Sequence, residues 1–210
     1  VRDPQTGRPT PDLGLMSATV EAIRAECPGL LINLSTAISP ESTIEQRIAP
    51  VPVLKPDLAS LNTNSMNAAL ANRKTGEIIA EYVFTNTFAQ MAHFATVMRD
   101  NLVRPELEVY DLGGMYNVLL FRKQGIIPEP LHFQMVFGLV GGIPWDPANF
   151  ARLRELMPEG ASWSVCGVGP MQTQAGMCAA VNGGHIRVGL EDNTRMPDGA
   201  LAKGSWEQVR

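Results

Sequence analysis

Short apolar runs alternate with longer amphipathic segments along most of this 210-residue chain. Such alternation is typical of strand–helix units wound around a parallel sheet. It predicts strands over residues 30–35, 58–62, 106–110, 132–139, 162–168 and 183–193. It predicts helices over residues 17–26, 42–48, 86–101 and 149–157, and two more that end near Leu120 and Ala180. The chain therefore contains about six strand–helix units, which is an α/β fold.

A closed (β/α)8 TIM barrel typically needs about 250 residues. We therefore expect a single barrel domain over residues 1–210 that lacks the first strand and the start of the second. Val1 would belong to the tail of the second strand, and the final helix would be cut short after Arg210. An open doubly wound sheet is the alternative, but it gives no reason for polar faces on so many strands.

Polar side chains recur on one face of several predicted strands. In residues 106–110, Glu106 and Glu108 share a face, and the alternate residues are apolar. In a barrel, inward-facing residues near the strand ends converge on one point. Two inward carboxylates are costly to bury unpaired, so we expect Arg187 or a bound cation to neutralise them. The predicted inward set is Asn33, Ser35, Ser60, Asn62, Glu106, Glu108, Arg187 and Glu191.

The segment GGHIRVGLEDN, residues 183–193, alternates as a strand with aliphatic residues on one face and Arg187 and Glu191 on the other. Neighbouring strand residues face opposite ways, so Glu191 and Asp192 are not expected to share a partner. One acid could then bind a metal while the other acts as a base at the mouth of the barrel. A surface strand with a salt bridge is the alternative interpretation.

A catalytic zinc site needs about three protein ligands, and a single carboxylate does not supply them. His93 is expected on a helix surface, and His132 and His185 open strands, at the end opposite a barrel's active site. The remaining ligands of such a site are therefore expected upstream of Val1.

Two glycine-rich turns follow the predicted sixth and seventh strands, at residues 138–142 (GLVGG) and 167–169 (GVG). Turns of this kind can present backbone N–H groups to phosphate, which makes Gly141, Gly142 and Gly169 candidates for cofactor binding. Tight turns alone are the alternative explanation for these glycines.

Composition excludes several classes of protein. The net charge of −4 and the absence of a basic run argue against nucleic-acid binding. No apolar run reaches the roughly 18 residues of a membrane span, and the first residues do not form a signal peptide. Three cysteines without paired spacing suit buried thiols in a reducing compartment. We expect a cytoplasmic protein.

Six motifs together resemble the β-keto acid cleavage enzymes, the family that includes 3-keto-5-aminohexanoate cleavage enzyme. The resemblance covers essentially the whole chain, and its most specific part is GGHIRVGLEDN. The other motifs are VRDPQTGRPTPD at Val1, NLST at Asn33, PELEVYDLG at Pro105, FGLVGGIP at Phe137 and WSVCGVG at Trp163.

The resemblance implies a zinc-dependent (β/α)8 barrel that condenses a β-keto acid with acetyl-CoA and releases acetoacetate and a new acyl-CoA. It implies that Glu191 is a zinc ligand, and that the family's other ligands, an HxH motif, fall before Val1. It assigns Asp192 as the base that removes the α-proton and Arg187 as the arginine that works with it. Ser35, Ser60 and Glu108 would contact the substrate.

The resemblance also implies acetyl-CoA as co-substrate and a homo-oligomer, expected to be a tetramer. One departure is Pro170, where the family often has an arginine, so no residue here matches that possible contact with coenzyme A. Two other functions stay open. One is a different barrel lyase or isomerase acting on a phosphorylated substrate, and the other is a non-catalytic barrel remnant.

Overall fold

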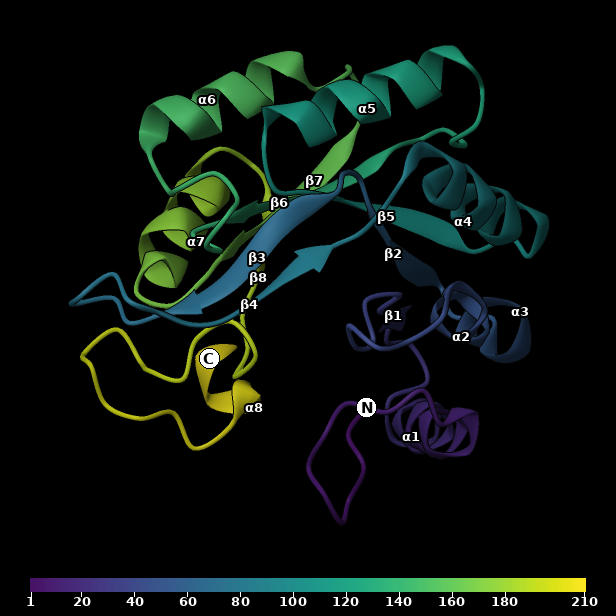
Figure 1. Ribbon diagram of the computed structural model, residues 1–210, viewed down its shortest axis with the longest axis horizontal. Helices are drawn as coiled ribbons and strands as arrows, with labels where there is room; N and C mark the ends of the chain where they lie inside the picture. The colour runs from purple at the N-terminus through teal and green to yellow at the C-terminus, as the bar shows by residue number, and fades with distance from the viewer.

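The computed structural model describes residues 1–210 and contains one parallel sheet, covered by helices, and a separate β-hairpin (Figure 1). Neighbouring sheet strands pair in chain order and all are parallel. A doubly wound sheet would reverse its order at a switch point, so the sequential order supports the predicted barrel. The sheet is an open arc with edges at β1 and β8. Its strands are β1 (Asn33–Leu34), β2 (Leu58–Asn62), β5 (Arg104–Val109), β6 (His132–Phe137), β7 (Ser162–Gly167) and β8 (His185–Arg187).

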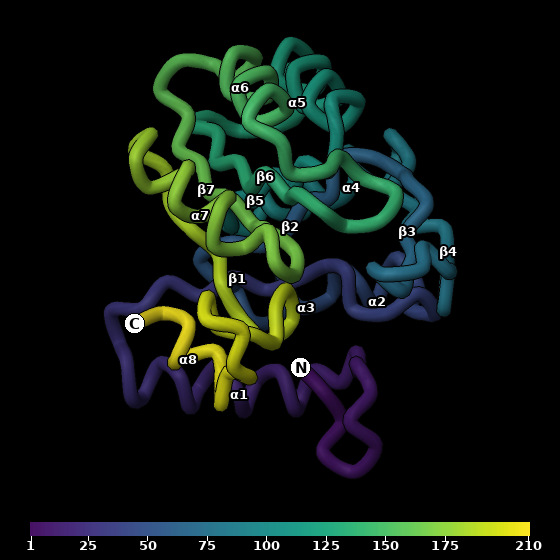
Figure 2. The backbone as a smooth tube through the Cα atoms, turned by 90° about the vertical axis from the view of Figure 1, so that its left-hand side faces the viewer, coloured from purple at the N-terminus to yellow at the C-terminus, as the bar shows by residue number.

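The main helices cover the outer face of this arc. In both views α5 and α6 lie on the side of the sheet opposite α1 and α8 (Figures 1 and 2). The helices are α1 (Leu13–Glu26), α2 (Ile44–Ile48), α3 (Pro50–Leu54), α4 (Phe88–Asp100), α5 (Leu112–Lys123), α6 (Pro147–Leu156), α7 (Met171–Val181) and α8 (Ser205–Gln208). No helix is long and apolar enough to cross a membrane.

Strand alternation separates an apolar outer face from a polar inner face. Leu107, Phe133, Met135 and Val165 are fully buried in the large core cluster that includes residues of the helices. Their neighbours along each strand point to the concave side, as the period of two requires. This arrangement confirms that Glu106 and Glu108 face inward together.

One predicted helix start was wrong. The first helix begins at Leu13 because the carboxylate of Asp12 caps it, accepting from the N–H of Leu15; Ser17 lies within the helix. The predicted helix over residues 42–48 does end at Ile48, but a short helix that was not predicted, α3, follows at once, with Pro50 in its first turn, where its missing N–H costs little. At the start of the chain, Arg2 forms a bridge with Pro9 in a local loop.

The sequence analysis missed the hairpin formed by β3 (Met66–Ala71) and β4 (Ile78–Phe84). It lies between β2 and α4 and crosses in front of the sheet in Figure 1. Ala69 forms a bridge with Val140, and a side chain at Gly141 would collide with the carbonyl of Asn67. The hairpin is therefore held against the loop that follows β6.

The last strand is much shorter than predicted, because β8 ends at Arg187. The N–H groups of Asp192 and Asn193 both donate to the carbonyl of Gly189, which closes a turn.

A second correction concerns the cysteines. Cys166 is buried, but Cys27 is exposed, so burial does not explain all three thiols.

Candidate active site

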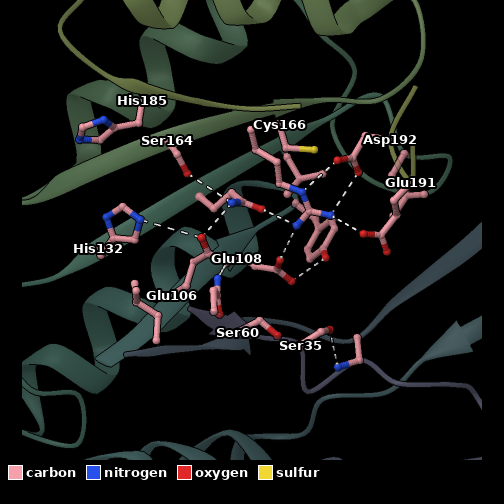
Figure 3. Close-up of a pocket in the computed structure, with 18 of the residues that line it drawn as sticks. Ser35, Ser60, Glu106, Glu108, His132, Ser164, Cys166, His185, Glu191 and Asp192 are labelled. Carbon is pink, nitrogen blue, oxygen red and sulfur yellow. Dashed lines mark hydrogen bonds and ion pairs between the residues drawn. The ribbon is translucent and has the colours of Figure 1, made fainter. Parts of the chain in front are cut away.

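The concave side of the sheet encloses a cavity of about 1040 Å³. Side chains at the inward-facing positions of all six strands of the parallel sheet line it, together with the hairpin residues Tyr82 and Phe84. Six residues singled out from the sequence meet in this one cavity, several of them labelled in Figure 3. They are Ser35, Ser60, Glu108, Arg187, Glu191 and Asp192.

Strand register stacks the polar residues in layers, as in a barrel interior. Ser60 pairs with Glu106, and Glu106 pairs with His132. Two residues further along the same strands, Glu108 pairs with Gln134. Such a stack brings groups distant in sequence into contact without a loop.

Arg187 is the most connected residue of the site, since all five of its guanidinium N–H groups have an acceptor. Nε donates to Oδ2 of Asp192 at 2.9 Å, and Nη2 donates to its Oδ1 at 3.2 Å. Nη2 also donates to Glu191 at 3.0 Å. Nη1 donates to Glu108 at 3.3 Å and to Gln134 at 2.9 Å. Burial lowers the pKa of Arg187, but the facing Cys166, Asp192 and Glu108 raise it above its usual range.

The prediction that Glu191 and Asp192 face opposite ways and share no partner is wrong, because both bind Arg187. Alternation applies only while the chain is extended, and the turn at Gly189 ends the strand first. The two acids still differ in surroundings. The side chain of Asp192 is 10% exposed, whereas that of Glu191 is 82% exposed.

Glu108 is fully inside the site and titrates near neutrality. Oε1 accepts from Arg187, and Oε2 accepts from the hydroxyl of Tyr110 at 3.0 Å. Burial raises the pKa of Glu108 to about 7, and the nearby charge of Glu106 adds to this rise against the opposing effect of Arg187. Its protonation state therefore changes across the physiological pH range.

Glu106 is hydrogen-bonded by two amides rather than paired with Arg187, which makes no direct contact with it. Oε2 accepts from Nδ2 of Asn33 at 2.5 Å, and Oε1 accepts from Nε2 of Gln134 at 2.9 Å. Burial raises the pKa of Glu106, and the hydrogen bond from Asn33 opposes that rise. Only Glu108 has the direct arginine contact that was predicted for both carboxylates.

The two candidate substrate-binding serines lie on the side of the cavity formed by β1 and β2 (Figure 3). The hydroxyl oxygen of Ser60 accepts from the N–H of Thr36 at 2.9 Å, and that of Ser35 accepts from the N–H of Ala37 at 3.0 Å. Both contacts use the oxygen as acceptor, so each O–H proton is available to a carboxylate in the cavity.

The three candidate glycines do not line the cavity. The N–H of Gly142 donates to Leu139, and the N–H of Gly169 donates to the carbonyl of Asp192, so neither amide is free for phosphate. Gly141 lies against Asn67 of the hairpin, as described above, and Gly169 lies against the guanidinium of Arg73. Close packing against the hairpin backbone thus explains why Gly141 carries no side chain, and Gly169 adopts a positive φ that favours glycine.

Zinc does not fit the residues present. No group of three histidine, cysteine, aspartate or glutamate side chains is placed to hold a metal ion. Glu191, the predicted ligand, is bound to Arg187 and extends into solvent. His132 and His185 line the cavity at the N-terminal ends of their strands; His132 contacts Ser162 at 2.8 Å, and burial lowers its pKa. His93 is exposed on α4, as predicted.

Sequence reasoning missed three residues of the site: Gln134, Tyr110 and Cys166. Gln134 carried a signal, because it is a polar residue between Phe133 and Met135 in an otherwise apolar strand. The hydroxyl of Tyr110 is placed to donate to Oε2 of Glu108 and to Oδ1 of Asn62, and this contact depends on the register of β2 and β5. Cys166 lies beside Arg187 in the register of β7 and β8.

Comparison with known proteins identifies a family for this chain. The family model described as beta-keto acid cleavage enzyme matches residues 1–210. The chain is similar to 3,5-dioxohexanoate:acetyl-CoA acetone transferase of Paraburkholderia graminis, with 36% identity over 100% of this chain and 73% of that protein. It is also similar to 3-keto-5-aminohexanoate cleavage enzyme of Fusobacterium nucleatum, with 34% identity over 97% of this chain and 70% of that protein. A third relative is 3-dehydrocarnitine:acetyl-CoA trimethylamine transferase of Rhizobium meliloti, with 28% identity over 96% and 71%.

Proposed function

The chain belongs to the β-keto acid cleavage enzyme family, and on that premise we propose that it transfers the acyl group of a β-keto acid to the coenzyme A of acetyl-CoA. The products would be acetoacetate and a new acyl-CoA. The observation that carries this assignment is the Arg187–Asp192 pair, in which the arginine grips both carboxylate oxygens at the edge of the cavity. A carboxylate held at one position is what proton abstraction next to a carbonyl requires.

Asp192 would take a proton from the carbon between the keto group and the carboxylate. The resulting carbanion attacks the acetyl carbonyl, and coenzyme A leaves as the thiolate. The thiolate then attacks the original keto carbon, the bond to the former carbanion carbon breaks, and Asp192 returns its proton to that carbon. Acetoacetate and the new thioester leave, so atoms and charge balance.

Two groups of residues would hold the substrate during these steps. The free O–H protons of Ser35 and Ser60 suit the carboxylate of the β-keto acid. Glu108 and Gln134 would hold Arg187 from the side away from Asp192. The buried acid–arginine pairs keep charge fixed in the cavity, so little reorganisation is needed when the carbanion forms.

Zinc, the cofactor implied by the resemblance, would polarise the keto group when bound. Glu191 would be its ligand from this chain, but the residues around it do not complete a site. None of the steps above therefore relies on a metal.

The phosphates of coenzyme A would lie near the loops after β6 and β7. The amides of Gly142 and Gly169 are already paired, so the attraction would come from Arg73 at the hairpin tip. Its Nη2 lies 3.2 Å from the carbonyl of Val168. A cation at this place could take over the contact that Pro170 does not provide.

The two alternatives have less support. A barrel aldolase would use a lysine Schiff base, but no lysine lines the cavity. A non-catalytic remnant would not need the three buried or half-buried charged groups Arg187, Glu108 and Asp192 in one network, because such a network is costly to maintain.

The test uses purified full-length protein, isotopically labelled acetyl-CoA and four β-keto acids, with products identified by mass spectrometry. The acids are 3,5-dioxohexanoate, 3-keto-5-aminohexanoate, 3-dehydrocarnitine and 3-oxoadipate, which differ in the charge of their side group. Label in acetoacetate together with the matching acyl-CoA supports the assignment. Decarboxylation alone, or thioester hydrolysis without a new acyl-CoA, contradicts it.

A further inference from the structure

A continuous row of hydrogen-bonded side chains crosses the cavity from one edge of the sheet to the other. It starts at Asn33 on β1, passes through Glu106 on β5 and Gln134 on β6, and ends at Arg187 on β8. The two inner members are almost completely buried, with exposed fractions of 6% for Glu106 and 3% for Gln134. Neither takes part in the steps proposed above by touching the substrate.

Both oxygens of Glu106 accept from N–H donors, one from Asn33 and one from Gln134. Because an N–H group donates to each oxygen of Glu106, neither oxygen has to carry a proton. The ionised carboxylate therefore fits this site. An ionised carboxylate accepts hydrogen bonds and donates none. Glu106 therefore requires the NH2 end of the Gln134 amide to face it.

Fixing one end of an amide fixes the other. With the NH2 group on Glu106, the carbonyl oxygen of Gln134 points at Arg187, where Nη1 donates to it at 2.9 Å. The reverse orientation would set an N–H group against a guanidinium that has only donors. Gln134 is thus a connector with a single allowed direction between an acceptor and a donor.

Nη1 is the part of the guanidinium farthest from the Asp192 pair. Holding it prevents rotation of the planar group, which would break the two parallel contacts that Nε and Nη2 make with Asp192. We propose that Gln134, oriented by Glu106, is a positioning residue that holds Arg187 in line with Asp192. This inference rests on the proposed function only for its turnover readout.

The experiment exchanges the two groups of the connector. Gln134→Glu places a carboxylate against Glu106, and Glu106→Gln removes the group that selects the amide direction. The double variant Glu106→Gln/Gln134→Glu restores a donor facing an acceptor at the same positions, with the net charge unchanged. Gln90→Glu on α4 is the matched control, because glutamate keeps the capping role of Gln90 outside the site.

The first readout needs no turnover. In protein with 15N-labelled arginine, the Nε–H resonance of Arg187, assigned with Arg187→Lys, reports the contact with Asp192. We expect each single variant to lose or shift this resonance, and the double variant and Gln90→Glu to keep it. Unchanged resonances in both single variants overturn the inference, as does a double variant that is unfolded or lacks the resonance.

The second readout is kinetic and separates this inference from the proposed function. With the labelled acetyl-CoA assay, each single variant should lose at least about tenfold in kcat with KM for acetyl-CoA within about twofold, and the double variant should regain most of kcat. Restored resonance in a protein without any acyl transfer supports the positioning role and refutes the proposed function. Loss of kcat that the double variant does not recover overturns the positioning role.

Discussion

Nε and Nη2 of Arg187 hold Oδ2 and Oδ1 of Asp192 in two parallel hydrogen bonds, at 2.9 and 3.2 Å. Only five positions separate the two residues along the chain, and the turn at Gly189 between them makes the contact possible. The remaining donors of the arginine reach Glu191, Glu108 and Gln134. One side chain thus couples the edge of the cavity to its buried interior.

Asp192→Asn should lower kcat by about 10²–10⁴-fold, because a general base contributes a factor of this size. The measurement is the rate at which the full-length protein exchanges the α-protons of a β-keto acid with solvent deuterium. Asp100→Asn, on an exposed aspartate of α4, serves as control and should exchange at the normal rate. Normal exchange in Asp192→Asn would rule out this residue as the base.

Arg187→Met should destabilise the fold by roughly 3 kcal/mol, since it leaves the carboxylate of Glu108 buried without its cation. Urea unfolding at pH 8 measures this change. Arg99→Met is the control; it removes an exposed pair with Asp100 and should cost less than about 1 kcal/mol. Equal unfolding midpoints for the two variants would show that the buried pair contributes no more than the exposed one.

The free energy of unfolding should fall as pH rises from about 4.5 to about 7 through the titration of Glu108. Burial raises its folded-state pKa to about 7, so the folded protein binds the proton more tightly than the unfolded chain. The stabilising effect is complete below the unfolded pKa and is lost as pH passes the folded pKa. A shift of this size corresponds to about 3 kcal/mol.

Glu108→Gln should remove this part of the pH dependence. Urea unfolding of the wild type and of the variant at pH 5, 6, 7 and 8 makes the comparison. Parallel curves for the two proteins would mean that Glu108 does not titrate in this range.

Gly141→Ala should release the hairpin, because the new side chain collides with the carbonyl of Asn67. Trypsin cleavage after Arg73 and Lys74 at the hairpin tip should become faster, as measured by mass spectrometry of the fragments. Gly199→Ala is the matched control, with a similarly positive φ and open space around it, so it carries the backbone strain without the collision. Equal cleavage of the two variants would contradict a docked hairpin.

The 210-residue chain should not retain stoichiometric zinc after dialysis, because Glu191 has no second and third ligand beside it. Elemental analysis after equilibration with zinc measures this. One tightly held zinc per chain that survives in Glu191→Gln would show a site elsewhere in the chain. Zinc that the wild type retains and Glu191→Gln loses would show that a site forms around Glu191 from groups that do not lie close to it in this structure.

The local sequence pattern was sufficient to predict the strands of the parallel sheet and which of their side chains face inward. The residues 58–62 form the predicted strand without correction, and Glu106 and Glu108 face the cavity as their spacing requires. Both results follow from side-chain alternation, which depends only on the extended backbone. The six parallel strands in chain order follow from the same strand–helix alternation.

Contacts between distant segments decided the rest. The turn at Gly189 brought Glu191 and Asp192 to one arginine, and strand register brought Gln134 between Glu106 and Arg187. Docking of the hairpin gave Gly141 a packing role in place of the predicted phosphate contact. Alternation in sequence specifies which face a side chain occupies, but its partner depends on register and turns, which are determined by packing across the whole sheet.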